Sequence, residues 1–189
     1  MNRDALNQQI LELAQEVGAL SYGDFTLASG KKSSYYFDGR LLSLHPLGSQ
    51  LLAQACLPPI VAARAESVGG PATGGIPLVA AITLWSQIDG TPISGFFVRA
   101  EAKDHGRQKS VEGVIRPGSA VAVVDDVCTT AGSLFRAIQG AEDLGCKVVK
   151  VMSVLDRVEG GSEELRKRGY DFETLLEAPP DGKVGVARQ

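Results

Sequence analysis

The chain is poor in the residues that staple small secreted domains or build structural metal sites. Its 189 residues include three cysteines, widely spaced and without a Cys-x-x-Cys pair. This pattern supports neither a disulfide framework nor a zinc ribbon, and it fits a reducing cytoplasm best.

Long hydrophobic runs are also missing. The longest span residues 120–124 and 148–155, and Lys150 interrupts the second. Both fall far short of the roughly 20 apolar residues that a membrane-spanning helix needs. The N-terminus starts Met-Asn-Arg-Asp and lacks the apolar core of a secretory signal. We therefore expect a cytoplasmic protein with no membrane partner.

No charge of one sign predominates. Nineteen basic and twenty-two acidic side chains give a net charge of −3, which offers no general attraction for nucleic acid, so any anion site must be local. The apolar fraction of 44% and charged fraction of 22% are typical of a globular protein, and the length predicts a single domain, 1–189.

The first third of the chain predicts helices and a hairpin outside the main sheet. Apolar residues recur at helical spacing over 6–17, and Gly18 ends that helix. Residues 24–37 alternate β-prone segments with a basic turn, which indicates a short hairpin. A helix is expected from Pro46 to about Cys56, ended by the prolines at 58 and 59.

Beyond this point strands and helices alternate. We expect helices over 76–88, 133–144 and 162–168 and strands over 93–98, 120–124 and 147–155. Strands that are apolar on both faces indicate an α/β protein with a mostly parallel central sheet flanked by helices. Ligands then gather at the carboxyl ends of the strands. Residues 100–113, polar and densely charged, are expected to be mobile.

The run from Val121 to Ser133 carries the most chemical information. An apolar strand ends in Asp125 and Asp126, and a loop of small and hydroxylated residues then opens a helix. Such a loop can bind a phosphate through backbone N–H groups and the helix dipole, whereas the carboxylates suit sugar hydroxyls or a phosphate-bound divalent cation. Together they indicate a phosphorylated sugar. In the alternative interpretation the acids are turn residues, and Thr130 or Ser133 only caps the helix.

This run resembles the phosphoribosyl-diphosphate (PRPP) signature of the type I phosphoribosyltransferases over thirteen residues. The resemblance implies that family's fold and a PRPP site in which the acids hold the ribose hydroxyls and the loop holds the 5′-phosphate. The PRPP-binding residues that it implies here are Asp125, Asp126, Val127, Cys128, Thr129, Thr130, Ala131, Gly132 and Ser133. Cys128 is expected to be a small buried filler.

Residues 99–109 form a basic stretch with four basic and two acidic side chains. Alone, such a loop is usually just solvated surface. Transfer from PRPP, however, builds oxocarbenium character at C1′ and negative charge on the departing diphosphate, which Arg99, Lys103 and His105 can stabilise.

Several segments resemble the orotate phosphoribosyltransferase family in particular: 25–38, Glu66–Pro71, Glu101–Gly106 and Leu155-Asp156-Arg157. The resemblance implies synthesis of orotidine 5′-monophosphate from orotate and PRPP with Mg²⁺, by a homodimer whose basic loop enters the neighbouring site. It implies a hood over about residues 1–40 and a PRPP-binding core over about 41–189. It casts Lys103, Asp125 and His105 as catalytic residues, with Mg²⁺ arriving on PRPP near Asp125 and Asp126. Orotate would meet Thr129, Arg157, Tyr36 and Phe37.

This chain departs from the family where many members carry lysine, at Ala28, Gly74 and Ala100. Lys31, Lys32 and Arg107 are the nearby cations that could supply the missing charge, and Gly69-Gly70-Pro71 could form a backbone nest for the diphosphate. Two alternatives stay open: a type I transferase for a purine or another base, and a PRPP-sensing regulator that has lost catalysis.

Overall fold

The computed structural model describes residues 3–26, 30, 32–100, 110–179 and 182–187. Within them the helices are α1 Arg3–Glu16, α2 Gly39–Ser43, α3 Pro46–Ala62, α4 Gly75–Asp89, α5 Gly132–Glu142 and α6 Gly161–Lys167. The strands are β1 Leu20–Thr26, β2 Lys32–Phe37, β3 Ser67–Pro71, β4 Ser94–Val98, β5 Val111–Gly113, β6 Ala120–Cys128, β7 Lys147–Asp156, β8 Phe172–Glu177 and β9 Gly185–Val186.

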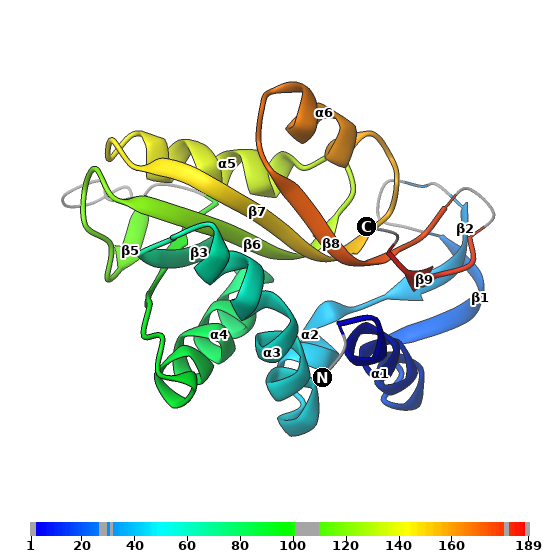
Figure 1. Ribbon diagram of the computed structural model, residues 1–189. Helices are drawn as coiled ribbons and strands as arrows, with labels where there is room; N and C mark the ends of the chain where they lie inside the picture. The colour runs from blue at the N-terminus through cyan, green and yellow to red at the C-terminus, as the bar shows by residue number, and fades with distance from the viewer. Residues whose placement is uncertain (1–2, 27–29, 31, 101–109, 180–181, 188–189) are drawn as a thin grey trace.

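The main sheet has the order β5-β4-β3-β6-β7-β8-β9. The five inner strands are parallel, and the short strands β5 and β9 close the two edges in antiparallel pairing. Helices α1 to α4 cover one face, and α5 and α6 cover the other (Figure 1). The predicted α/β architecture with a mostly parallel, helix-flanked sheet is confirmed.

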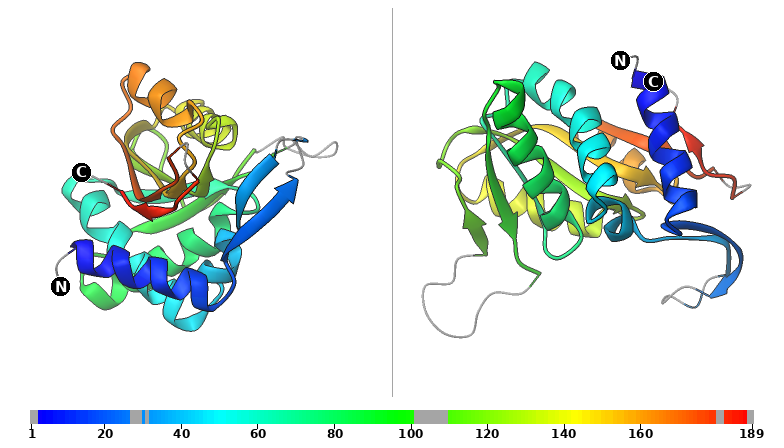
Figure 2. Two further views of the ribbon diagram at one scale, coloured as in Figure 1. Left: turned by 90° about the vertical axis from the view of Figure 1, so that its right-hand side faces the viewer. Right: turned by 90° about the horizontal axis from the view of Figure 1, so that it is seen from below.

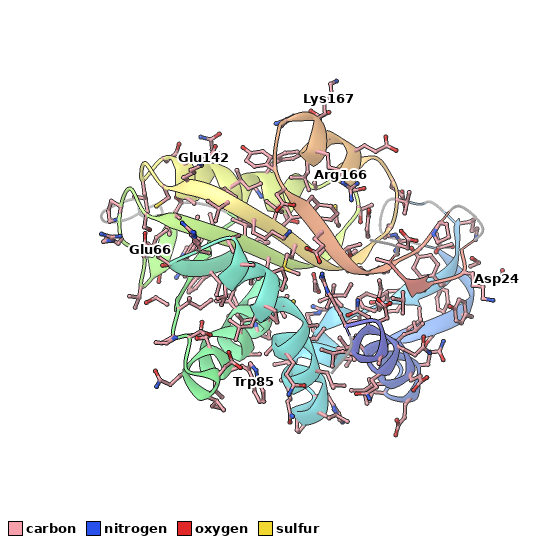
Figure 3. All side chains as sticks on the ribbon, viewed as in Figure 1. Asp24, Glu66, Trp85, Glu142, Arg166 and Lys167 are labelled. Atoms are coloured by element: carbon pink, nitrogen blue, oxygen red, sulfur yellow. The ribbon has the colours of Figure 1, made fainter. Side chains whose placement is uncertain are left out.

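Strand β6 shows why the sheet is covered on both sides. Val121 and Val123 belong to the apolar cluster under α5, whereas Ala122 and Val124 belong to the cluster under α1, α3 and α4. All four side chains are fully buried. Glu142 at the end of α5 and Arg166 on α6 lie on the opposite side of the sheet from Trp85 of α4 (Figure 3). Of the described helices, none is both long and apolar enough to cross a bilayer.

The predicted hairpin forms a separate antiparallel sheet of β1 and β2, which starts at Leu20, earlier than expected. It extends away from the main sheet (Figure 2). Helix α1 packs its apolar face into the larger core cluster, beside α3. The hairpin is therefore anchored at its base, by Leu20 and Phe37, to the body of the protein.

One helix boundary was predicted wrongly. Helix α3 passes through Pro58 and Pro59 and ends at Ala62. The prolines remove N–H groups from the helix, but they point away from the core, while Leu57 and Ile60 are buried in it. Packing of that apolar face therefore keeps the chain helical.

Strand β3 was also missed, because its sequence Ser-Val-Gly-Gly-Pro has little β propensity. The structure shows why glycine is needed there: a Cβ on Gly69 would lie 2.2 Å from the ring of Phe96, and one on Gly70 would lie 2.4 Å from the Val124 carbonyl oxygen. The segment is thus a central, fully buried strand. The short β5, β8 and β9 were not predicted either.

Candidate active site

The acid pair lies within β6, not after it. The strand was expected to end at Val124, but it pairs with β7 as far as the Cys128–Asp156 register position. Asp125 is only 4% exposed, and Asp126 is partly buried. The structure therefore holds both carboxylates on rigid sheet backbone at the carboxyl end of a central strand, where ligands of such sheets bind.

Asp125 accepts two hydrogen bonds from its own chain. The hydroxyl of Ser133 donates to Oδ2 at 2.6 Å, and the backbone N–H of Asp126 donates to Oδ1 at 2.9 Å. Burial, followed by the charge of Asp126, raises the pKa of Asp125 to about 7, and the Ser133 bond acts against that shift. Asp125 therefore changes charge near neutral pH.

Asp126 occupies a slot between two glycines of different elements. A Cβ on Gly39 of α2 would lie 2.6 Å from Cβ of Asp126, and one on Gly74 would lie 2.7 Å from its Oδ1. Burial in this slot raises the pKa of Asp126. The absence of side chains at both glycines lets backbone close on the acid from two sides.

The loop after β6 leads into α5 without a capping side chain. Ala131 is the N-cap residue, with φ of 60°, and its side chain makes no capping hydrogen bond. The alternative in which Thr130 or Ser133 caps α5 is therefore wrong, because Ser133 bonds Asp125 instead. Uncapped N–H groups at the positive end of a helix are suited to binding a phosphate.

The start of helix α6 contacts this loop. The N–H of Gly161 donates to the Thr129 carbonyl at 3.0 Å, and a Cβ there would lie 2.6 Å from that oxygen and from the Ala131 nitrogen. Thr129 and Val127 are partly buried, and Thr130 and Gly132 are exposed. The loop is thus held in place while part of its backbone faces solvent.

Cys128 is fully buried in the smaller core cluster, as expected for a filler. Burial raises the pKa of its thiol to about 12. Among the predicted PRPP-binding residues, it can therefore contribute backbone groups but no thiolate.

A second helix begins beside the acid pair. Helix α4 has Gly74 as its N-cap and no side-chain cap. The N–H of Ile76 donates to the Thr73 carbonyl at 3.2 Å and Pro77 has no N–H, so the first turn leaves the N–H groups of Gly74 and Gly75 for a ligand. The predicted anion nest at 69–71 is wrong, because these residues form strand β3. The first turn of α4 lies closer to the acids, since Gly74 borders Asp126. The acid pair therefore lies between two helix N-termini, those of α4 and α5.

Of the expected diphosphate-binding cations, the structure describes Arg99. It follows β4, pairs with Glu112 at 2.5 Å, and lies with its guanidinium 5.8 Å from the centre of the Phe97 ring. Lys103 and His105 lie outside the described residues, as do Ala28, Lys31 and Arg107. Lys32 donates to the Thr26 hydroxyl across the hairpin, at 2.8 Å.

Arg157 lines a cleft of about 460 Å³ between the hairpin and the loop after β8. Its side chain is 10% exposed, its guanidinium lies 4.6 Å from the centre of the Tyr35 ring, and it contacts the Ser33 hydroxyl at 3.3 Å and Glu159 at 3.2 Å. Its backbone N–H donates to the Cys128 carbonyl at 2.9 Å. A backbone hydrogen bond therefore joins Arg157 to Cys128, the last residue of β6 before the loop that leads to α5.

The aromatic residues of the hairpin differ in their exposure to solvent. Tyr36 is 43% exposed and packs on Phe25, whereas Phe37 is buried in the larger core cluster. Tyr35, which was not singled out, faces Arg157, and burial raises its pKa. The alternation of β2 could have indicated this, because Tyr35 and Phe37 share one face of the strand.

Comparisons with known proteins bear on this site as a whole. The phosphoribosyl transferase domain family matches residues 67–186. The orotate phosphoribosyltransferase of Rhodopirellula baltica is 39% identical over 183 residues, which cover 93% of this chain and 95% of that protein.

Two solved structures of orotate phosphoribosyltransferase from Mycobacterium tuberculosis are similar. A complex with Fe(III) dicitrate is 32% identical with a TM-score of 0.80, covering 91% of this chain and 96% of that one. A complex with PRPP is 26% identical with a TM-score of 0.72, covering 92% and 89%. The type I phosphoribosyltransferase fold is thereby confirmed. The sequence, the fold and the placement of the acid pair lead to one conclusion: this chain belongs to the orotate phosphoribosyltransferase family.

Proposed function

We propose that this protein transfers the 5-phosphoribosyl group from PRPP to orotate, giving orotidine 5′-monophosphate and diphosphate for pyrimidine synthesis. The observation that carries the proposal is the acid pair lying between two helix N-termini that have no side-chain cap. PRPP has a matching order of groups: a phosphate, a diol and a diphosphate. A relative of known structure binds PRPP, and the relatives named above are orotate phosphoribosyltransferases.

Each part of the substrate then has a site. The 5′-phosphate binds the loop from Thr129 to Ser133 and the first turn of α5. Asp125 and Asp126 accept hydrogen bonds from the ribose hydroxyls, most strongly when both are ionised. The diphosphate lies toward α4, where Arg99, Lys103 and His105 provide positive charge.

Orotate binds on the hairpin side. Its carboxylate suits the planar guanidinium of Arg157, which Tyr35 supports from one face. Glu159 forms an ion pair with Arg157. The orotate carboxylate would replace Glu159 in that pair or bind Arg157 together with it. Thr129 and Tyr36 complete the set proposed for the base; Phe37 supports it from the core.

The chemistry needs charge stabilisation more than proton transfer. As the bond from C1′ to the diphosphate breaks and the bond to the orotate nitrogen forms, C1′ becomes cationic. The carboxylates of the acid pair stabilise the ribose side, and Lys103 and His105 stabilise the leaving diphosphate. The hairpin and residues 100–113 would exclude water from the cation.

We propose Mg²⁺ as the metal, bound together with PRPP. No cluster of three or more His, Cys, Asp or Glu side chains that could hold a metal occurs in the part of the chain that the structure describes. Mg²⁺ is commonly held by one or two carboxylates, substrate phosphates and waters, and the acid pair fits that pattern. When bound, the ion neutralises charge on the diphosphate.

We also propose that the protein is a homodimer in the cytoplasm, with residues 1–40 as hood and 41–189 as PRPP-binding core. Leu84 and Ile88 of α4 and Val114 after β5 are 64% to 68% exposed, beside an apolar groove of about 580 Å³. A second copy would cover this surface, which lies next to the strands that flank residues 101–109. The buried free thiols support a reducing compartment. Light scattering should give twice the 19.9 kDa chain mass.

The test of the reaction is an orotate-depletion assay with and without PRPP and Mg²⁺. Orotate should disappear only when both are present, and uracil, hypoxanthine and adenine should not replace it. Turnover with a purine alone would support the rival transferase. Binding of PRPP without turnover of any base would support the regulator.

A further inference from the structure

Arg40 is a cation at the acid pair that neither the sequence motifs nor the proposed mechanism uses. It belongs to the short helix α2, which packs against both α4 and β6. Its neighbour Gly39 lies directly against the side chain of Asp126. The Arg40 guanidinium interacts electrostatically with Asp126 and with Tyr36 of the hairpin. Arg40 is therefore located where the hairpin meets the acid pair.

The guanidinium is held by a carboxylate that also fixes the start of α2. Asp38 caps the helix by accepting from the Arg40 N–H at 3.0 Å, and it accepts from Nε and from one terminal nitrogen of Arg40, both at 2.8 Å. This bidentate pair fixes the position of a planar, doubly donating cation. The Arg40 side chain is nevertheless 54% exposed, so an anion can reach it from solvent.

We propose that Arg40 binds the diphosphate of PRPP, together with the backbone N–H groups of Gly74 and Gly75 at the start of α4. The inference rests on the proposed function and adds a binding residue to it. Asp126 lies between Gly39 and Gly74, so α2 and the first turn of α4 approach the same carboxylate from two elements. Arg40, the next residue of α2, interacts electrostatically with that carboxylate. A diphosphate that follows the ribose past Asp126 meets both. Position 74 is glycine, where many family members carry lysine. Arg40 can supply positive charge at this end of the acid pair instead.

The test compares two arginines in similar settings. Arg40→Gln removes the proposed contact. Arg168→Gln is the matched control, because Arg168 is also 54% exposed and also pairs with a carboxylate, that of Glu164, but on α6. Binding of inorganic pyrophosphate with Mg²⁺ is measured by calorimetry, without orotate, and thermal unfolding verifies that both variants fold.

Pyrophosphate affinity and the KM for PRPP should each worsen at least about tenfold in Arg40→Gln, as expected for loss of a charge-assisted hydrogen bond. Both values should stay within about twofold of the wild type in Arg168→Gln, and Arg40→Lys should recover part of the loss. The KM for orotate should change little in every variant.

Two results would overturn the inference. One is that Arg40→Gln binds pyrophosphate as tightly as Arg168→Gln does. The contact between Arg40 and Asp38 would then be an ordinary surface ion pair. The other is a rise in the KM for orotate alone, which would place Arg40 on the base. Wild-type protein that binds pyrophosphate but consumes no orotate would instead contradict the proposed function.

Discussion

The hydroxyl of Ser133 donates a 2.6 Å hydrogen bond to Oδ2 of Asp125, across the turn that joins β6 to α5. Ser133 is the second residue of α5, so the start of the helix is tied to the acid rather than capped by its own side chain. The loop proposed to bind phosphate and the carboxylate proposed to bind ribose are thereby held in one geometry.

Ser133→Ala should move the pH dependence of the enzyme upward. The bond from Ser133 lowers the pKa of Asp125 against the effect of burial, so its loss raises that pKa above about 7. The midpoint of kcat/KM for PRPP should rise by about one pH unit, because a hydrogen bond to a charged group contributes about 1.5 kcal/mol or more. A pH profile from 5 to 9 measures the midpoint. Ser133→Thr keeps the hydroxyl and should retain the wild-type value; an unmoved midpoint in Ser133→Ala would contradict the assignment.

Asp125→Asn should make the free energy of unfolding less dependent on pH. The folded protein keeps a proton on Asp125 up to about pH 7, whereas the unfolded chain releases it near pH 3.9. The folded state binds more protons between these values, so wild-type stability falls as pH rises through this window. Urea denaturation at pH 5 and pH 8 should show a smaller loss in the variant. Asp143→Asn, on the surface at the end of α5, should behave as wild type.

Arg157→Lys should raise the KM for orotate about tenfold or more and leave that for PRPP within about twofold. Lysine offers no planar fork for a carboxylate and no flat face for Tyr35. Arg166→Lys is a matched control, because Arg166 lies 5.2 Å from the centre of the Phe172 ring but lines a different pocket. If only the KM for PRPP increased, the assignment of Arg157 to the orotate site would be wrong.

Gly39→Ala should weaken PRPP binding and destabilise the protein. The new Cβ would lie 2.6 Å from Cβ of Asp126, so backbone or acid must shift, at a cost of about 1–3 kcal/mol. Gly185→Ala is the control, because its Cβ would meet nothing within 4 Å. Calorimetry with PRPP and thermal unfolding measure the two effects, and equal behaviour of both variants would show that the slot is not needed.

Lys103→Ala should lower kcat at least about a hundredfold with little change in the unfolding temperature, because one charge aimed at the leaving group is worth a few kcal/mol. Lys103 lies outside the described residues, so this prediction follows from the chemistry and from the family resemblance. Lys109→Ala, in the same basic stretch, should have a much smaller effect. Steady-state and single-turnover kinetics separate chemistry from product release.

The parts of the fold that followed from sequence are those with strong local patterns. Val121 to Val124 are apolar without interruption, which is the pattern of a strand covered on both faces, and residues 24–37 contain two β-prone segments around a basic turn. The residue types of the acids and the small-residue loop left a purely structural interpretation open, and the thirteen-residue resemblance to the PRPP signature identified them as a site.

The missed features depend on contacts that are distant in sequence. The Phe96 ring packs so closely on strand β3 that position 69 must be glycine, and Pro58 stays in a helix because Leu57 and Ile60 are buried against other elements. Tyr35 was overlooked because its role depends on Arg157, more than a hundred residues away. Arg40 carries no motif at all; its position matters only because Gly39 contacts Asp126.

The short segment 157–161 connects the two halves of the proposed substrate site. Its first residue, Arg157, bonds the Cys128 carbonyl and reaches the hairpin cleft, and its last, Gly161, bonds the Thr129 carbonyl beneath the phosphate loop. Any movement of this segment must displace the arginine and the loop together. A sugar phosphate that immobilises the loop would therefore also fix the arginine in advance, so that the base arrives at a site already shaped for it.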